Sequence, residues 1–359
     1  MTTFKDAAMS PAWTPFEFKP DDADGPLWQR FHAFRRQRSL EHDPDLPVPP
    51  DDVAEANIRH REPTWHERRF LVEDEDRITG MLAVRYPKPE SPEYEGWKHI
   101  VHAGGGVVAP ARRQGVGRAL LGSALELLDH YGARLLMVSS SETDGQQCIE
   151  HLGGRALQLE RRSRLDLATL DWHRVDRWIA DREVRAPTTT MEMYPHRLPD
   201  DILEEFCAAE TTLMNLMPWD DLDHGEIVIT TDDLRDLYKR LDRANTEHHT
   251  FLSREADGTI SGITDVSWRP WAPEEAHQWF TGVHPDYRGR GLGKALKAAM
   301  LRFLADRHGG LRWVYTENST TNAAMLAINE RLGFREHRVY KSYQLERDAV
   351  AGYLTRGGK

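Results

Sequence analysis

The sequence predicts an α+β protein made of two related domains, each a mixed β-sheet flanked by helices. The chain has 359 residues, which is more than one hydrophobic core usually organises. A turn that combines glycines with basic residues occurs twice, with Arg112 and Arg288 176 positions apart. Predicted strands precede helices in mixed order in both halves, which favours a duplicated α+β domain over a short-period repeat.

The first half begins with a short strand and a helix and ends with an alternating strand. Between them lie an acidic, proline-rich connection at 41–52, a hairpin and a third strand that leads into the first glycine-basic turn. The expected elements are, in order, a strand at 13–20, a helix at 26–40, strands at 68–74, 78–86 and 97–108, a helix ending near 128, a strand at 133–140, a helix at 144–154 and a strand at 155–167.

The second half repeats this order after an additional pair of helices. Its expected elements are a strand at 188–195, helices at 200–216 and 231–244, strands at 248–255, 260–268 and 274–283, the second turn and its helix, a strand at 311–317, a helix at 320–334 and a strand at 335–346. We therefore predict a first domain at 1–168, a connector at 169–188 whose helix packs between the halves, and a second domain at 189–359.

Composition narrows the class of protein. A formal net charge of −11 argues against a nucleic-acid partner. It would attract cationic amines, with a charge that only keeps the protein in solution as the favoured alternative. No stretch has the length and apolarity of a membrane helix, and the first residues lack a signal peptide, so we expect a cytoplasmic protein. The two cysteines, Cys148 and Cys207, lie in different halves, so neither a disulfide scaffold nor a metal site is expected. Both a monomer and a homodimer remain open.

The second turn, VHPDYRGRGLGKALKAAML at 283–301, has the composition of an anion site. It matches neither GxxxxGK[ST], because position 288 is Arg, nor GxGxxG, because position 294 is Lys. Gly289, Gly291 and Gly293 can adopt positive φ and leave backbone N–H groups open at the start of a helix. A pyrophosphate suits such a cradle.

The run V-x-P-x-Y-R-G-R-G-L-G-K-A-L at 283–296 resembles the acetyl-CoA motif of the GNAT superfamily of N-acetyltransferases, and TENSTTNAAMLAINERLGF at 316–334 resembles that family's next motif. The resemblance implies a sheet, first antiparallel and then parallel, that splays between its fourth and fifth strands, with acetyl-CoA in the gap. The chain is then similar to tandem-domain members, of which mycothiol synthase is one layout. The implied contacts with acetyl-CoA are Val283, Arg288, Gly289, Arg290, Gly291, Leu292, Gly293 and Lys294.

The two halves are not expected to be equivalent. The first copy keeps Arg112 and Gly117, but counted from the preceding proline its turn is one residue shorter, which would displace its N–H groups. Glycines at 104–106 stand where the second half has large side chains, and nothing in the first half matches Asn318. We predict that the second half carries the chemistry and that the first half is degenerate and structural. An alternative is that the first half also binds CoA.

Acetyl transfer to an amine calls for a base, because an alkyl ammonium with a pKa of ~10.4 must lose a proton. Asp265 interrupts a β-rich run, where aspartate is unfavourable, and aligning the hairpins sets Ala83 against it. Glu317 ends the fifth strand, and His277 lies on the fourth. All three are candidates for contact with substrate, with a surface or pairing role as the alternative for each.

Many GNAT proteins place a tyrosine acid four residues before the glycine that closes the second motif, whereas this chain has Asn329. Asparagine can hydrogen-bond the sulfur but cannot supply a proton. A thiol pKa of ~8.5 makes the thiolate a tolerable leaving group, so an acid is dispensable. Asn318, Asn322 and Asn329 lie near one helix face, and we predict that they bind the pantetheine amides, with helix capping as the alternative.

Two segments rich in aromatic and acidic residues, 214–226 and 268–275, are candidates for the acceptor site. Asp220, Asp221 and Asp223 could hold a cationic amine, and Trp268 and Trp271 could stack on a ring. The alternatives are a solvated loop and a cover for the hairpin.

The sequence therefore predicts an acetyl-CoA-dependent N-acetyltransferase that acts on a primary amine of a small molecule by direct attack. The acceptor would be an amino sugar, an aminoglycoside or an amino-acid-like metabolite. The alternatives are a non-catalytic CoA-binding scaffold and an acetyltransferase similar to mycothiol synthase, with an amine on a pseudodisaccharide as acceptor.

Overall fold

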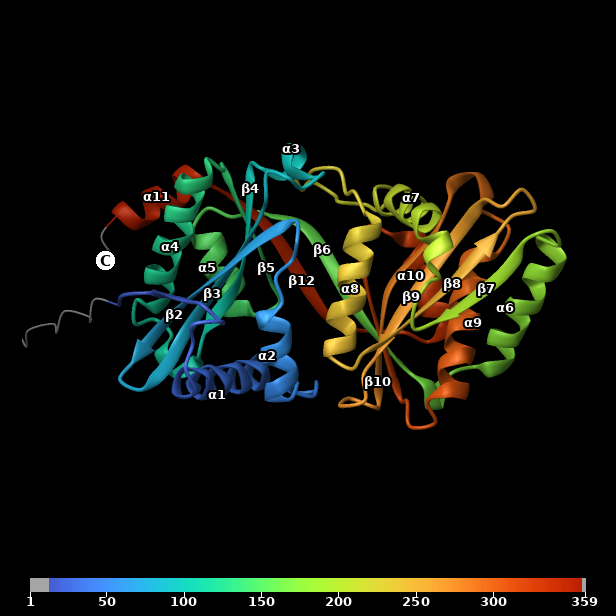
Figure 1. Cartoon of the computed structure of the whole chain (residues 1–359), viewed down its shortest axis with the longest axis horizontal. Coiled ribbons are helices and arrows are strands. Elements are labelled where there is room, and N and C mark those ends of the chain that lie inside the picture. Colours follow the sequence, from blue (N-terminus) through green and yellow to red (C-terminus); the bar gives the residue numbers. More distant parts are fainter. Residues whose placement is uncertain (1–12, 357–359) are drawn as a thin grey trace, which may run out of the picture.

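The strands of both halves join edge to edge in one sheet in the computed structural model, which describes residues 13–356. Their order is β1-β2-β3-β4-β5-β12-β6-β11-β10-β9-β8-β7, with the first half at the left and the second at the right of Figure 1. The strands are β1 (Phe16–Phe18), β2 (Trp65–Asp74), β3 (Arg77–Pro87), β4 (Ile100–Val107), β5 (Leu135–Ser140), β6 (Ala156–Asp166), β7 (Thr190–Pro195), β8 (Glu247–Arg254), β9 (Ile260–Trp268), β10 (Glu275–Val283), β11 (Trp313–Ser319) and β12 (Arg335–Glu346).

The helices begin at residues that suit a helix start. Asp24 caps the first helix, and Thr230 forms a reciprocal capping box with Asp233 at α8. The helix α2 was not predicted; it begins after Pro50, inside the last residues of the segment expected to be a connection, and opens with two aspartates. The helices are α1 (Gly25–His42), α2 (Asp51–Arg59), α3 (Tyr94–Trp97), α4 (Val116–Tyr131), α5 (Thr143–His151), α6 (Trp172–Arg185), α7 (Leu203–Met214), α8 (Thr231–Arg243), α9 (Leu292–Arg307), α10 (Ala323–Leu332) and α11 (Arg347–Thr355).

Each half has the predicted mixed sheet. The strands β2, β3 and β4 are antiparallel and β4 then pairs with β5 in parallel, while β8, β9, β10 and β11 repeat this arrangement. The long helix after each turn, α4 or α9, packs its apolar face on the sheet of its own half. The fold class predicted from the sequence is confirmed.

The two halves exchange their last strands. The strand β6 of the first half pairs with β11 of the second, while β12 of the second half pairs with β5 of the first. Leu165 of β6 is buried in the core of the second half, and Leu345 and Val350 complete the core of the first. Figure 1 shows β6 and β12 crossing the middle, with α11 beside the first half. The contiguous ranges 1–168 and 189–359 therefore do not each contain a complete sheet.

The connector forms a helix, as predicted, but does not lie between the halves. The helix α6 packs against α9 at the far edge of the second half, where Val175 is fully buried (Figure 1). Its tryptophans Trp172 and Trp178 lie beneath Arg302 and Lys294 of α9. The apolar face of this helix finds its partner within the second half, so the prediction of an interdomain helix was wrong.

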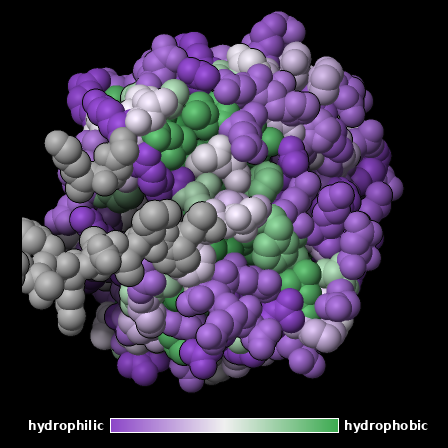
Figure 2. Space-filling view, turned by 90° about the vertical axis from the view of Figure 1, so that its left-hand side faces the viewer, coloured by the Kyte–Doolittle hydropathy of each residue, from purple (hydrophilic) through white to green (hydrophobic). Residues whose placement is uncertain are grey.

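The surface of the first half is mostly polar, with apolar side chains gathered in a band across the end of the molecule shown in Figure 2. Among the helices of residues 13–356, none combines the length and the apolarity that a bilayer crossing requires.

Candidate active site

The two glycine-basic turns share one backbone course. In the first, Nε of Arg112 donates to the carbonyl of Val107 at 3.1 Å, and in the second, Nε of Arg288 donates to the carbonyl of Val283 at 3.0 Å. The same arginine thus ties the turn back to the end of the same strand in both halves. The second turn starts the helix α9, and the first starts α4.

Left-handed residues shape both turns at matching positions. Gly115 and Gly291 cap the helices with φ of 94° and 85°. Two residues earlier, Gly289 has φ of 81°, and Arg113 in the first half has φ of 62°. A non-glycine residue rarely adopts this conformation, so the first turn keeps its course at the cost of some backbone strain.

The one-residue difference between the halves lies in a strand and not in the turn. Pairing between β9 and β10 shifts between Gln278 and Phe280, which leaves Trp279 as a bulged residue, while β3 and β4 pair without interruption. The prediction of a shortened first turn was wrong because Pro110 and Pro285 are not equivalent: Ala109 and Pro285 both open the short 3₁₀ turn after the strand.

Each half has a gap where its parallel strands part. Pairing of β10 with β11 ends at Gln278 and Thr316, although β10 continues to Val283. In the first half, pairing of β4 with β5 ends at Ala103 and Val138, although β4 continues to Val107. Both turns lie at the end of the diverging strand, so each opens onto a gap in the sheet.

The cradle of the second half is made by its backbone. The guanidinium of Arg290 donates to Glu255 and to Thr189, and Lys294 lies over the ring of Trp178, so these cations have protein partners. The first N–H groups of α9, at Leu292, Gly293 and Lys294, have no acceptor within their helix. Leu292 is buried and anchors the helix start in the core.

A cavity of about 930 Å³ runs through the gap of the first half. Its lining joins the glycine strand, the first turn, the start of α5, the inner face of α1 and Tyr340 of the exchanged strand β12. An ionic cluster crosses it, in which Arg38 and Arg112 both donate to the carboxylate of Glu142. The first half therefore retains a cradle and room for a ligand, features that its predicted degeneracy did not include.

Asp265 is buried and stabilises the bulge of β10. Its Oδ1 accepts the backbone N–H of Phe280 at 2.8 Å, and its Oδ2 lies 2.9 Å from Nε2 of His248 on β8. In the first half, Ala83 pairs with Gly104 at the corresponding place, where no residue is bulged. The aspartate in the strand thus has a structural partner, and it lies beside the gap.

Glu210 on α7 is an acidic residue that the sequence analysis missed. Burial, together with the nearby charge of Asp265, raises the pKa of its carboxyl above the ordinary value. The signal was present in the sequence, because position 210 falls on the helix face occupied by the buried residues Leu203, Phe206 and Leu213. A carboxyl that holds its proton up to higher pH and lies near the gap is a candidate base.

Asp265 and Glu317 lie on the same face of the sheet. Ser267, His277 and Tyr315 are paired neighbours on β9, β10 and β11, so their side chains share one face of the sheet. Asp265 lies two positions from Ser267, and Glu317 lies two positions from Tyr315, which puts both acids on that face. The carboxylate of Glu317 is half-exposed and accepts from Nε of Arg162 at 2.6 Å. The ring of His277 stacks on Tyr315, and burial together with nearby arginines lowers the pKa of His277 to about 3, so this imidazole is neutral.

The three predicted asparagines have different environments. Asn322 caps α10 through the N–H of Met325, as the capping alternative predicts. Asn329 is buried and donates from Nδ2 to Oδ1 of Asn318 at 2.7 Å, which links α10 to the end of β11. The buried Oδ1 of Asn329 has no hydrogen-bond partner among residues 13–356.

The acidic segment at 214–226 joins the halves instead of forming a pocket. Asp220 accepts from Ser319 at 3.0 Å, and Asp223 lies 3.0 Å from His99 and pairs with Arg134 of the first half. Asp221 has a distant ion pair at the surface. Basic side chains of the first half thus hold Asp223, whereas Asp220 accepts only from hydroxyl groups, so an amine site stays a prediction for Asp220 and Asp221.

The two predicted tryptophans differ. The indole of Trp268 stacks on His308 with centroids 3.9 Å apart and donates to the carbonyl of Pro273, so it covers the hairpin as the alternative predicts. Trp271 instead lines a cavity between the halves.

Lys297 was also missed by the sequence analysis. It lies in the core between α9 and the sheet, and burial lowers the pKa of its ammonium to about 7. Its Nζ donates to Gln278, Nε2 of Gln278 donates to Thr264 at 2.8 Å, and the hydroxyl of Thr264 lies 2.7 Å from that of Thr281. This buried polar chain ends at the diverging part of β10.

One group of side chains has the composition of a metal site. Glu247, His249 and His308 bring ligand atoms within 4.8 Å of one another. Both histidines lie near Oε2 of Glu247, and Nε of Arg307 donates to that oxygen at 2.8 Å. The backbone N–H of His196 points at Nδ1 of His249 at 3.4 Å. The guanidinium opposes a cation there, so this group is better described as an ion-pair cluster.

Comparison with known proteins identifies the family. The model of the acetyltransferase (GNAT) family matches residues 30–153 and 213–334, which is more than half of the chain. A mycothiol acetyltransferase of Salinispora arenicola is 43% identical over 96 residues, covering 26% of this chain and 31% of that protein. The N-alpha-acetyltransferase RimI of Mycobacterium tuberculosis is 32% identical over 97 residues, covering 27% of this chain and 58% of that protein. The matched segment therefore spans only about a third of the mycothiol acetyltransferase.

Solved structures agree over nearly the whole chain. A tandem GNAT protein from the clavulanic acid biosynthesis pathway superposes with a TM-score of 0.74 at 18% identity, covering 93% of this chain and 98% of that one. A GCN5-related N-acetyltransferase of Sphaerobacter thermophilus gives a TM-score of 0.60 at 15% identity, covering 93% and 96%. With its two matched domains and this architecture, the chain belongs to the acetyltransferase (GNAT) family and carries two GNAT domains in tandem.

Proposed function

We propose that the second half transfers the acetyl group of acetyl-CoA to a primary amine of a small molecule. The observation that supports this most is the meeting of a backbone cradle, a gap in the sheet and the buried carboxylate of Asp265 at one place. The backbone N–H groups of residues 292–294 would bind the diphosphate of CoA. Arg288 and the glycines 289, 291 and 293 would fix the backbone conformation of the turn that orients these N–H groups. The N–H of Val283 would donate to the thioester oxygen.

Glu210 is the proposed base. It would take a proton from the ammonium, and the neutral amine would then attack the thioester carbon to give a tetrahedral adduct. Collapse of this adduct breaks the C–S bond, the attacking nitrogen loses its second proton to the departing CoA thiolate, and the products are the amide and the CoA thiol; the proton held by Glu210 then passes to solvent. Asp265 raises the pKa of Glu210 by its charge, and Glu317 faces the amine from the other side of the gap. The free Oδ1 of Asn329 would accept a pantetheine N–H.

The first half would bind CoA without catalysing transfer. Its turn has the same course and its cavity is open, but Ala83 stands where the second half has Asp265. A second candidate acceptor is the amine that mycothiol acetyltransferases acetylate, favoured by the 43% identity of the matched segment.

The test is to incubate the purified chain with acetyl-CoA and a panel of amines, including amino sugars, aminoglycosides, amino acids and the mycothiol precursor. Release of free thiol that depends on the amine, with an acetylated product in mass spectrometry, supports the proposal. Absence of turnover on every amine, combined with calorimetric binding of CoA, would favour the non-catalytic scaffold.

A further inference from the structure

A cavity of about 500 Å³ lies between the two halves, next to the bulge of β10. The first half contributes α2, β2 and β3 to its walls, and the second contributes α8, the connection between β9 and β10, and Trp279. A smaller cavity of about 220 Å³ adjoins it and shares Glu62, Arg85 and Arg240. The two form a groove that only the paired halves create.

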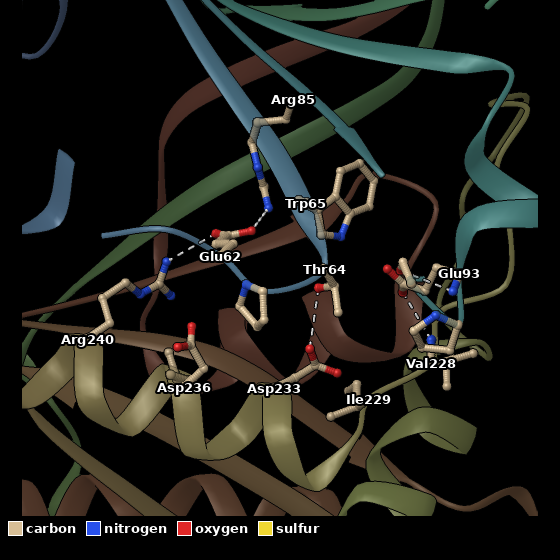
Figure 3. Close-up of a pocket in the computed structure, with 14 residues that line it drawn as sticks. Glu62, Thr64, Trp65, Arg85, Glu93, Val228, Ile229, Asp233, Asp236 and Arg240 are labelled. Atoms are coloured by element: carbon tan, nitrogen blue, oxygen red, sulfur yellow. Dashed lines mark hydrogen bonds and ion pairs between the residues drawn. The ribbon is translucent and has the colours of Figure 1, made fainter. Parts of the chain in front are cut away.

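Three of the four arginines that line the larger cavity have carboxylate partners. Arg69 pairs with Glu67 at 2.5 Å, and Glu62 lies between Arg85 and Arg240, as Figure 3 shows. The guanidinium of the fourth, Arg269, has no ion pair within 4 Å and no hydrogen bond within the described part of the chain, and the carboxylate of Glu275 acts on it only through its nearby charge. Its guanidinium lies 5.5 Å from the ring centroid of Trp271, and burial lowers its pKa, which marks a cation held partly away from water.

Two tryptophans add a donor and an apolar surface. The indole Nε1 of Trp271 is buried without an acceptor among residues 13–356. Trp279 is 41% exposed, although large apolar side chains are usually covered. The residues of one cavity wall thus include a guanidinium without an ion pair, a buried indole N–H without an acceptor and an open aromatic face. A ligand with a carboxylate next to an apolar group would suit all three, because the carboxylate can accept from the guanidinium and the N–H while the apolar group packs on the ring of Trp279.

The position of this wall connects it to the reaction. Trp279 immediately precedes Phe280, whose N–H is held by Asp265, and its ring centroid lies 5.1 Å from that of His248. The pairing of β10 with β11 ends at Gln278, the residue directly before Trp279, so Trp279 lies where the gap opens. An acceptor anchored at Arg269 would therefore extend its amine toward the gap.

We propose that the interdomain cavity is the acceptor site and that it selects amines bearing a carboxylate next to an apolar or aromatic group. The guanidinium of Arg269 would bind the carboxylate through two N–H groups, Trp271 would add a third donor, and Trp279 would cover the side chain. This inference rests on the proposed function and narrows its substrate class from any small amine to amino-acid-like compounds.

The test compares each common amino acid, and a set of dipeptides, with the same compound as its primary amide. The amide removes the negative charge but also lowers the pKa of the amine, so a simple preference is ambiguous. The decisive quantity is the acid-to-amide ratio of kcat/KM in Arg269→Gln relative to the unsubstituted chain, because the difference in amine pKa cancels. We expect this ratio to fall roughly tenfold to hundredfold, the loss of one charge-assisted contact. Arg269→Lys should restore part of it.

The control is Arg331→Gln, an exposed arginine on α10 outside the cavity, which should leave the ratio unchanged. A ratio that stays within about twofold in Arg269→Gln overturns the proposal. Calorimetry with the free amino acids in the absence of acyl donor separates this inference from the proposed function. Binding that Arg269→Gln weakens would support the cavity even without turnover, whereas turnover without any acid preference would leave the transferase and refute the cavity.

Discussion

The carboxylate of Asp265 accepts the backbone N–H of Phe280 at 2.8 Å, at the residue where β10 bulges. An inserted residue in a strand leaves a backbone group without its ladder partner, and a buried N–H without an acceptor is costly. The insertion of Trp279 and the aspartate on the neighbouring strand therefore belong together. The first half has neither, since β3 and β4 pair regularly and Ala83 takes the place of the acid. This pair of differences separates the two halves more clearly than their turns do.

Replacing Asp265 should loosen the bulge. Asp265→Ala removes the acceptor of a buried N–H, so we expect the free energy of unfolding to fall by about 1–3 kcal/mol. Asp265→Asn keeps an acceptor oxygen and should cost less. Urea denaturation measures both, with the exposed Asp201→Ala as a control. If Asp265→Ala unfolds like that control, the carboxylate does not hold the bulge.

Glu210→Gln should separate stability from activity. The raised pKa of Glu210 means that the folded protein binds a proton more tightly than the unfolded chain does, so stability falls as pH rises from the ordinary carboxyl pKa to the raised one. The substitution removes this loss, and the melting temperature of the variant relative to the unsubstituted chain should therefore increase from pH 5 to pH 8.

Loss of the base should lower kcat by about 10²–10⁴-fold, and the activity of the unsubstituted chain should decline as pH falls through the raised pKa of Glu210. Glu204→Gln, an exposed residue on the same helix, is the matched control for both measurements. A pH profile of kcat that is the same in Glu210→Gln and in the control would remove Glu210 from the mechanism.

Sequence patterns predicted what depends on local residues. The glycines of the second turn, the alternating strands and the helix after the turn all have short-range signatures, and the positive φ of Gly289 and Gly291 agrees with the conformation that a bare backbone allows. The bulge at Trp279 could not be predicted, because the second half has one residue more than the first in this region and the sequence does not say whether that residue lies in the strand or in the turn. Only the pairing of β10 with β9 decides between them.

Features that depend on distant partners were not predicted. Alternation marks β6 and β12 as strands but does not say which edges they join, so their exchange between halves could not be read from either segment. Asp223 looked like part of a cation site because its partners His99 and Arg134 lie 124 and 89 positions away in the chain. Glu210 could have been found, since a charged residue on an apolar helix face is a local signal.

Lys297 should make stability depend on pH in the alkaline range. Its pKa is about 7 in the folded protein, against ~10.4 for a free lysine, so between these values the unfolded chain binds more protons and stability rises with pH. Lys297→Met should abolish this rise. Thermal melts at pH 7 and pH 10 measure it, and an equal change in both proteins would show that Lys297 keeps its charge when folded.

A carboxylate placed in either cradle should reveal what each half binds. The substitutions Gly117→Asp and Gly293→Asp are sterically mild, because the nearest atoms to an added Cβ are 3.9 and 3.6 Å away, and aspartate suits a helix start. Calorimetry should find two CoA sites in the unsubstituted chain and one in each variant. We expect Gly293→Asp to abolish transfer and Gly117→Asp to retain it. The opposite pattern would assign the chemistry to the first half.

The strand exchange predicts that the halves cannot fold alone. A chain of residues 1–168 lacks β12, so β5 would expose an edge and the first core would lose Leu345 and Val350. A chain of residues 169–359, which keeps α6, lacks β6, so β11 would be bare on one side and the second core would lose Leu165. Unpaired edges and missing core residues favour aggregation. Each half expressed alone should therefore be insoluble or lack a cooperative melt, while coexpression should recover a stable complex through the two exchanged strands. A sharp thermal transition in either isolated half would mean that its own last strand can fold back into the vacant edge.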